Sequence, residues 1–189
     1  MSLRAVGLLL AAGHSRRFGA ADKLAAPLDG RPLVAHAAGA LAALPLAARL
    51  VVLRDPGLAA SCPGLTPVPL PPGAEAQSDS LRAGIAAAAA LDPDLVLIAL
   101  GDMPRVTTAD LAAVLDRTRA TGLRCAAAGP DGPLPPACFP AADLPALMAL
   151  SGDRGAGALL RDLPAAQRVP LPPAHLVDVD TPEGLAALG

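Results

Sequence analysis

The stretch LLLAAGHSRRFGAADKL (8–24) runs from consecutive apolar residues directly into a glycine, two arginines, a second glycine and a lysine. Apolar runs without alternation are typical of a strand that is covered on both faces, as in a parallel sheet. Comparable runs occur at 6–10, 50–53 and 95–100. The stretch therefore predicts a buried first strand that is followed by a basic, glycine-containing loop.

Helical patterns separate these predicted strands. They cover 32–44, which starts with a proline, 80–91, which is rich in alanine, and 107–119, where Thr107 and Asp110 have the spacing of a capping box. Alternating strands and helices predict an α/β fold: a single-domain, open, mostly parallel Rossmann-like sheet with helices on both faces. We expect residues 1–189 to form one domain, and the proline-rich segments 67–73, 130–136 and 170–173 to be surface connections.

Composition excludes several classes of protein. The 189 residues carry a net charge of −2, which gives no general attraction to nucleic acid. No run approaches the roughly 20 apolar residues that a membrane span needs, and GHSRRFG follows the first apolar run where a signal peptide would have small residues. We therefore expect a cytoplasmic protein without membrane or nucleic-acid partners. The spacing of Cys62, Cys125 and Cys138 favours buried free thiols.

The loop after the first strand has the chemistry of an anion site. Gly13 and Gly19 permit tight turns with exposed N–H groups, while Arg16, Arg17 and Lys23 supply positive charge. The segment has neither the G-K-[ST] of a Walker A loop nor the G-x-G-x-x-G of dinucleotide folds. A solvated basic loop without a ligand is the alternative. Lys23 is the only lysine of the chain, and we expect the site to require it.

Two acidic segments follow apolar runs. Asp102, in LGDMP, is either a turn-forming residue or a metal ligand at the open end of the sheet. Asp178 and Asp180 lie two residues apart in DVDTPEG, so an extended chain directs them to the same side. Thr181 and Pro182 also predict the start of a helix.

Several other polar residues can be explained either by ligand binding or by helix capping alone. Ser80, in AQSDS, is a candidate for nucleotide contact or a helix cap. The segment SGDRG (151–155) precedes a predicted helix whose N-terminus could receive an anion, or it is a plain cap. We expect His14, His36 and His175 to be incidental to the chemistry.

The sequence LAAG-x-S-R-R-F-G-x-x-D-K-L (10–24) resembles the signature of the molybdenum cofactor cytidylyltransferase family, whose fold is that of the nucleotide-diphospho-sugar transferases. G-D-M-P-x-V (101–106), D-V-D-T-P-E (178–183) and G-D-R-G-A (152–156) match the same family. The resemblance implies that the loop binds the nucleotide, through residues Ala11, Ala12, Gly13, Ser15, Arg16, Arg17, Lys23 and, farther along the chain, Ser80.

The resemblance also implies a reaction and its cofactor. Lys23, Arg17 and Asp102 would be catalytic, Asp102 and Asp180 or Asp178 would bind Mg²⁺, and a segment made of Gly152, Asp153 and Gly155 would bind the acceptor. CMP would pass from CTP to the terminal phosphate of molybdopterin, with release of pyrophosphate. The alternatives are a guanylyltransferase, a sugar-phosphate nucleotidyltransferase, and a non-catalytic factor that delivers the cofactor to a molybdenum hydroxylase. The resemblance also implies that a molybdenum hydroxylase or its maturation chaperone is a partner.

Overall fold

A seven-stranded sheet forms the centre of the computed structural model, which describes residues 3–13, 18 and 22–188. Its strands lie in the order β5 (Thr66–Val68), β4 (Ala48–Leu53), β1 (Ala5–Ala11), β6 (Leu95–Leu100), β8 (Gly132–Pro140), β7 (Cys125–Gly129) and β9 (Arg168–Val169). β8 pairs antiparallel with both of its neighbours, while the other pairs are parallel. The mostly parallel sheet expected from the sequence is confirmed.

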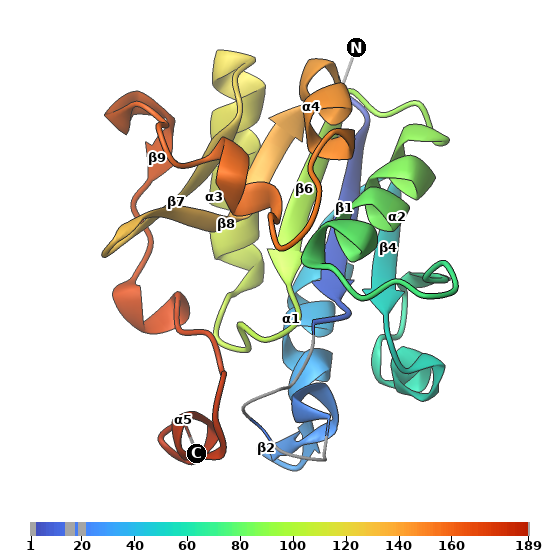
Figure 1. The fold of residues 1–189 in the computed structure, drawn as a ribbon. Coiled ribbons are helices and arrows are strands. Elements are labelled where there is room, and N and C mark those ends of the chain that lie inside the picture. The colour runs from blue at the N-terminus through green and yellow to red at the C-terminus, as the bar shows by residue number, and fades with distance from the viewer. Residues whose placement is uncertain (1–2, 14–17, 19–21, 189) are drawn as a thin grey trace.

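Helices cover both faces of this sheet (Figure 1). α1 (Leu33–Ala42) and α3 (Thr108–Thr121) pack on one face, and α2 (Gln77–Ala89) and α4 (Leu144–Met148) on the other. A short α5 (Pro182–Ala186) ends the chain. Short 3-10 turns connect these elements at Lys23–Ala25, Pro56–Ser61, Ala141–Asp143, Ala156–Leu159, Ala165–Gln167 and Pro173–His175, and the hairpin of β2 (Pro27–Leu28) and β3 (Arg31–Pro32) precedes α1.

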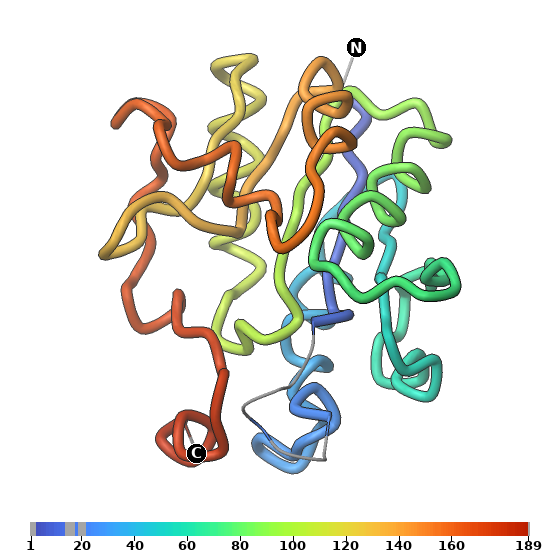
Figure 2. The backbone as a smooth tube through the Cα atoms, in the orientation of Figure 1, coloured from blue at the N-terminus to red at the C-terminus, as the bar shows by residue number. Residues whose placement is uncertain are grey.

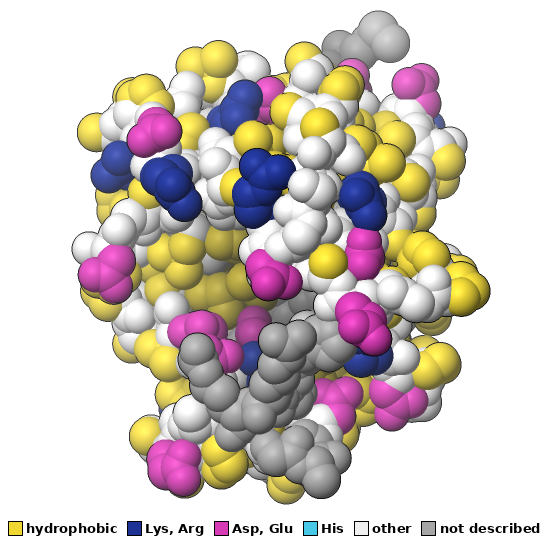
Figure 3. All heavy atoms as spheres, viewed as in Figure 1, with side chains coloured by type: hydrophobic (Ala, Val, Ile, Leu, Met, Phe, Trp, Pro, Cys, Tyr) yellow, Lys and Arg dark blue, Asp and Glu magenta, His cyan; other side chains and the backbone are white. Residues whose placement is uncertain are grey.

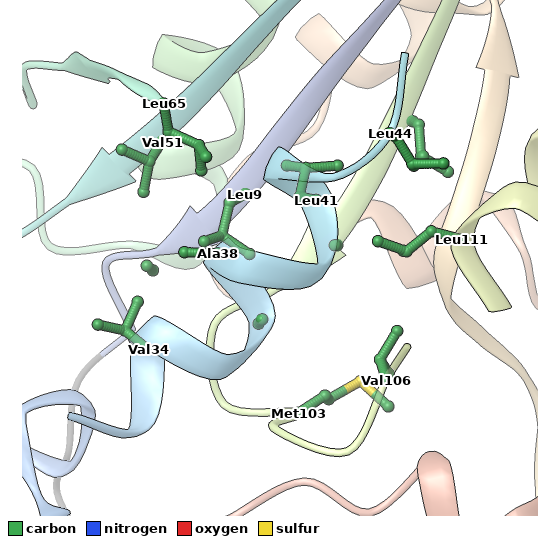
Figure 4. Packing of buried hydrophobic residues seen from close by; sticks show 14 of the residues in the cluster. Leu9, Val34, Ala38, Leu41, Leu44, Val51, Leu65, Met103, Val106 and Leu111 are labelled. Atoms are coloured by element: carbon green, nitrogen blue, oxygen red, sulfur yellow. The ribbon is translucent and has the colours of Figure 1, made fainter. Parts of the chain in front are cut away.

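Two apolar clusters hold the layers together. Leu9 of β1 packs beneath α1 with Val34, Ala38 and Leu41 (Figure 4), and Met103 from the turn after β6 belongs to the same cluster. Burying such side chains contributes roughly 25 cal/mol per Å² of apolar surface, so the turn that carries Asp102 is anchored in the core.

The capping box predicted at the start of α3 is present. Asp110 Oδ2 accepts hydrogen bonds from Thr107 N (2.8 Å) and Thr107 Oγ1 (2.7 Å), and Asp110 N donates to Thr107 Oγ1 (3.2 Å). These bonds satisfy donors at the helix N-terminus that have no partner within the helix. α3 is thereby fixed at the point where the chain leaves the Asp102 turn.

The expectation for the proline-rich segment 130–136 is wrong. Its residues from Gly132 onward belong to β8, and Pro135 and Pro136 are buried. The register of β7 and β8 shifts between Ala126 and Ala127, so that neither proline has a partner in that ladder. Proline is tolerated in a sheet at such an irregularity, because no ladder hydrogen bond is lost there.

The three cysteines are buried and free, as the sequence indicates. Burial raises the pKa of the Cys62 thiol to about 11 and that of Cys138 to about 12. Both groups therefore stay protonated at neutral pH and behave as small apolar side chains.

Candidate active site

Three segments that are far apart in the sequence meet at the carboxyl ends of β1 and β6. They are the turn that begins at Lys23, the turn after β6 with Asp102, and the extended segment that ends at Asp180. In an open α/β sheet the strand carboxyl ends are the usual place for a ligand site. Figure 2 shows these segments converging at the lower end of the sheet.

Lys23 connects the two carboxylates. Its Nζ donates to Asp102 Oδ2 at 2.8 Å and to Asp180 Oδ1 at 3.1 Å. The Lys23 residue is only 6% exposed, whereas the side chains of Asp102 and Asp180 are 25% and 45% exposed. Burial lowers the pKa of Lys23, but the charges and hydrogen bonds of Asp102 and Asp180 outweigh burial and raise the pKa overall. The ammonium therefore stays charged at neutral pH.

Local structure fixes each member of this group. Asp22 caps the Lys23 turn by accepting a hydrogen bond from Leu24 N at 3.0 Å. Gly101 lets the end of β6 approach β1, because a Cβ at this position would lie 2.9 Å from Ala11 Cβ. Val179 is fully buried and its N donates to Asp102 O at 2.9 Å, which fixes Asp180 beside Asp102.

A cavity of about 320 Å³, here named the Lys23 cavity, opens beside this group. Its lining comprises Ala12, Gly13, Lys23, Arg54, Glu75, Ala76, Gln77, Asp102, Asp153 and Asp180. Among these described residues two side chains are cationic and four are acidic. An anionic ligand therefore needs additional positive charge to enter, since like charges at short range repel.

The carboxylate pair suits a divalent cation that arrives with its ligand. Asp102 and Asp180 converge on one point, which the Lys23 ammonium marks, and Mg²⁺ commonly takes one or two carboxylates together with substrate phosphates and water. Within 3–13, 18 and 22–188, no group of three or more histidine, cysteine, aspartate or glutamate side chains is arranged to hold a metal. The donor set therefore fits a metal shared with a phosphate substrate better than a metal held by protein alone.

Several residues predicted for the site are present in it. Ala12, Gly13, Lys23, Asp102, Asp153 and Asp180 line the Lys23 cavity, and Ala11 lies buried at the end of β1. Ser15, Arg16 and Arg17 lie outside the described residues.

Asp178 and Ser80 are elsewhere. Asp178 lines a separate cavity of about 400 Å³, together with Leu134, Arg161 and Leu176. Ser80 is not among the residues that line the Lys23 cavity; it is buried in the first turn of α2, where its hydroxyl donates to Gln77 O at 2.9 Å.

The segment 152–155 adjoins the Lys23 cavity, although the helix expected after it is absent. Residues Ala156–Leu159 form a single 3-10 turn, which has too little aligned backbone for the expected helix dipole. Gly152 adopts a positive φ of 65°, and its carbonyl accepts a hydrogen bond from Ser78 N at 3.1 Å. Side chains rather than a helix terminus therefore provide polar groups there.

A second cavity of about 320 Å³, the Arg154 cavity, lies beside the first, because both are lined by Gln77 and Asp153. Leu10, Leu81, Leu100 and Pro135 give it an apolar wall, and Arg154, Gly155 and Arg161 are also among its residues. Figure 3 shows a hollow on the face viewed there, with apolar side chains at its floor and basic and acidic side chains at its edges.

Sequence reasoning missed Arg54, Glu75, Gln77 and Arg161. Arg54 directly follows β4, and its Nε donates to Ala12 O at 3.2 Å while Nη1 donates to Ala74 O at 3.1 Å. The strand-end rule that singled out Asp102 also applies to Arg54, so the signal was present.

Comparison with known proteins places the chain in a family. The chain matches the MobA-like NTP transferase domain over residues 7–169. The Bifunctional enzyme IspD/IspF of Gluconobacter oxydans (strain 621H) is 41% identical over 114 residues, which cover 55% of this chain and 29% of that enzyme. The chain thus spans less than a third of the length of this curated relative.

Two solved structures share the fold. A nucleotidyl transferase from Methanothermobacter thermautotroptrophicus (Mth528) has a TM-score of 0.79 and 19% identity, covering 98% of this chain and 95% of the other. Rv0371C of Mycobacterium tuberculosis H37Rv, in complex with manganese, has a TM-score of 0.76 and 22% identity, covering 98% and 97%.

No helix in the described part of the chain is long and apolar enough to cross a membrane. The family match spans most of the chain and includes Lys23 and Asp102. The chain belongs to the MobA-like NTP transferase domain family, whose fold is that of nucleotidyltransferases.

Proposed function

We propose that this protein is a Mg²⁺-dependent cytidylyltransferase that transfers CMP from CTP to the terminal phosphate of molybdopterin. The observation that carries this proposal is the contact of Lys23 Nζ with both Asp102 and Asp180 beside the Lys23 cavity. In the reaction an oxygen of the acceptor phosphate forms a bond to the α-phosphorus of CTP. The bond from that phosphorus to the bridging oxygen breaks, and pyrophosphate leaves with the electron pair.

Mg²⁺ would be held by Asp102 and Asp180 and would neutralise charge on the triphosphate. The manganese complex of the Rv0371C protein supports a divalent cation in this fold. Asp178 is not among the proposed ligands, because it lines a different cavity. The described lining of the Lys23 cavity is net acidic, so Mg²⁺ on Asp102 and Asp180 would reduce the repulsion between these carboxylates and the triphosphate.

Lys23 would bind the phosphates and stabilise the charge that develops on the leaving pyrophosphate. Its compact ammonium can change partners from the carboxylates to a phosphate without leaving the cavity. Arg16, Arg17 and Ser15 would bind the phosphates as the sequence predicts. The acceptor phosphate is already ionised at neutral pH, so alignment and charge neutralisation supply the catalysis and no general base is required.

The nucleotide base would lie beside Ala12 and Gly13, where the methyl of Ala12 narrows the space and favours cytosine. The Ser80 hydroxyl, which donates to Gln77 O, would hold the first turn of α2 so that Gln77 lines the Lys23 cavity. The acceptor would occupy the Arg154 cavity, in contact with Asp153 and Gly155, while Gly152 would shape the turn beside it. Its apolar wall and polar rim suit a flat ring with a charged group attached. Delivery to a molybdenum hydroxylase in the cytoplasm would follow from this activity.

A transferase with a different phosphorylated acceptor, such as a sugar phosphate, is the second candidate, because the matched family is not described by its acceptor. A pyrophosphate-release screen of CTP, GTP, ATP and UTP, with and without molybdopterin and with Mg²⁺ or EDTA, separates the two. We expect release with CTP, Mg²⁺ and molybdopterin together. Release with GTP alone among the nucleotides would refute the cytidylyl assignment, and CTP turnover only with another phosphate acceptor would refute the molybdopterin assignment.

A further inference from the structure

His175 contacts a carboxylate that belongs to the framework of the site. Its Nδ1 lies 2.9 Å from Oδ2 of Asp110, whose side chain is 7% exposed, whereas the side chain of His175 is 33% exposed. The same Asp110 oxygen accepts the two hydrogen bonds from Thr107 that cap α3. Because an ionised carboxylate only accepts hydrogen bonds, Nδ1 of His175 carries the proton and donates it to this bond.

Asp110 and His175 lie on the two chain segments that carry the candidate metal ligands. α3 starts at Thr108, six residues after Asp102, while His175 ends the 3-10 turn Pro173–His175, five residues before Asp180. The contact therefore connects the start of the helix behind Asp102 to the start of the segment that leads to Asp180.

The hydrogen bond from Val179 N to Asp102 O fixes the end of this segment beside Asp180, whereas apolar packing and the His175 contact hold its start. Leu176 and Val179 are buried and decide which face of the segment packs on the core, but the Asp180 side chain is 45% exposed. A hydrogen bond between the histidine and a buried carboxylate restricts sliding of the segment, which apolar contacts oppose only weakly because they are not directional.

We propose that His175 is a positioning residue that sets the separation of Asp102 and Asp180 through its hydrogen bond to Asp110. This inference rests on the proposed function, because it concerns the geometry of the proposed metal ligands. It assigns to the chemistry a histidine that the sequence indicates to be incidental. Groups that hydrogen-bond a metal ligand directly change metal affinity by about 10-fold or more when they are removed, and we expect His175, which acts through Asp110, to reach the lower end of that range.

The test compares three variants at position 175 by Mn²⁺ titration of the nucleotide-free protein, followed by electron paramagnetic resonance. Asn places its amide nitrogen near the position of Nδ1, Gln places it near Nε2, and Leu has no donor. We expect His175→Asn to bind Mn²⁺ within about twofold of the wild type, and His175→Gln and His175→Leu to bind about 10-fold more weakly.

Arg117→Leu is the matched control. Arg117 Nη1 donates to Ala166 O at 3.1 Å, so this variant also loses a hydrogen bond between α3 and the C-terminal part of the chain, but near the other end of the helix. We expect its Mn²⁺ affinity to equal that of the wild type. Thermal unfolding of each variant verifies that it is folded. If the Leu variant does not fold, the comparison of the Asn and Gln variants, which both keep a polar side chain, still tests the inference.

Equal Mn²⁺ affinity of the Asn and Gln variants would overturn the inference, as would weaker binding by the Arg117→Leu control. If the wild-type protein binds Mn²⁺ but the Gln and Leu variants bind it as tightly as the Asn variant does, the proposed function stands and the positioning role is wrong. If the wild-type protein binds no Mn²⁺, the proposed metal role is wrong and the inference is wrong with it.

Discussion

Lys23 has the same partners that a divalent cation would use. Its Nζ contacts one oxygen of Asp102 and one of Asp180 at hydrogen-bond distance, so a metal ion on these carboxylates would lie close to the ammonium and compete with it. Its pKa is raised, and the stabilising effect of the pairing is therefore fully present below the ordinary lysine pKa of 10.5. That effect is lost as the pH rises through the higher pKa of the folded protein. At neutral pH Lys23 stays protonated, so a divalent cation would compete with a charged ammonium for the two carboxylates.

Lys23→Met removes the competing ammonium and leaves two carboxylates facing each other. We expect the nucleotide-free variant to bind Mn²⁺ about 10-fold more tightly than the wild type, because a neighbouring unit charge is lost. We also expect nucleotidyl transfer to fall by about 100-fold or more, because the phosphates lose a donor. Calorimetric Mn²⁺ titration and pyrophosphate release measure the two effects. Unchanged Mn²⁺ affinity would show that Lys23 does not compete with the metal.

Asp178 and Asp180 provide a paired test, since they lie two residues apart but line different cavities and only Asp180 contacts Lys23. Asp180→Asn removes a charge from the proposed metal ligands, and we expect Mn²⁺ binding to weaken by about 10-fold or more and transfer to fall with it. Asp178→Asn removes the same charge two residues away, and we expect both quantities to stay near those of the wild type. The opposite result in the two variants would assign the metal to Asp178.

At the scale of elements, the approach of β1 and β6 determines how close Ala12 lies to Asp102. Gly101 N donates to Leu10 O at 2.9 Å, and the absence of a side chain at Gly101 permits contact with Ala11. Strand ends that meet at this distance let Ala12 and Gly13 after β1 and Asp102 after β6 line the same cavity. A side chain at position 101 would push the ends of β1 and β6 apart.

Gly101→Ala places a Cβ 2.9 Å from Ala11 Cβ and 3.3 Å from Ala11 Cα. We expect the free energy of unfolding to fall by about 1–3 kcal/mol, because the backbone of β1 has to move. Gly39→Ala in α1 is the control: no atom lies within 4 Å of its added Cβ, and alanine favours the helix by up to about 1 kcal/mol. Urea unfolding measures both changes. Equal stability of the two variants would contradict the close approach at Gly101.

At the scale of the whole molecule, the site joins parts of the chain that are separated by most of its length. Lys23 contacts Asp102 and Asp180, which lie 79 and 157 residues farther along. A ligand that bridges these segments stabilises the fold as a unit, because it binds only when all three are in place.

CTP with Mg²⁺ should therefore raise the unfolding temperature of the wild-type protein. A ligand at about 100 times its Kd adds about 2.7 kcal/mol to the free energy of unfolding. We expect CTP in EDTA to give a much smaller shift, because the acidic lining repels a nucleotide without its metal. Asp102→Asn should abolish the difference between the two conditions. A larger shift with GTP than with CTP would argue against cytosine selection.

The order of elements follows from local sequence. Apolar runs predict β1, β4 and β6 within two residues of their observed ends, and the Thr107 and Asp110 pattern predicts the start of α3, because strand burial and helix capping depend on neighbouring residues. Residues 130–136 were mistaken for a surface connection. Proline favours a loop locally, and only the ladder on either side of β8 decides that a strand can contain it.

The sequence by itself determined the sheet class, the basic loop and the three carboxylates that were candidates for the site. Only the tertiary structure placed Asp180 beside Lys23 and Asp178 in another cavity, added Arg54 and Arg161, and related His175 to Asp110. The physical reason is the distance along the chain over which each kind of interaction acts. Periodicity and capping act over a few residues, whereas the contacts of an active site depend on where distant strand ends and turns meet, which chain-wide packing fixes.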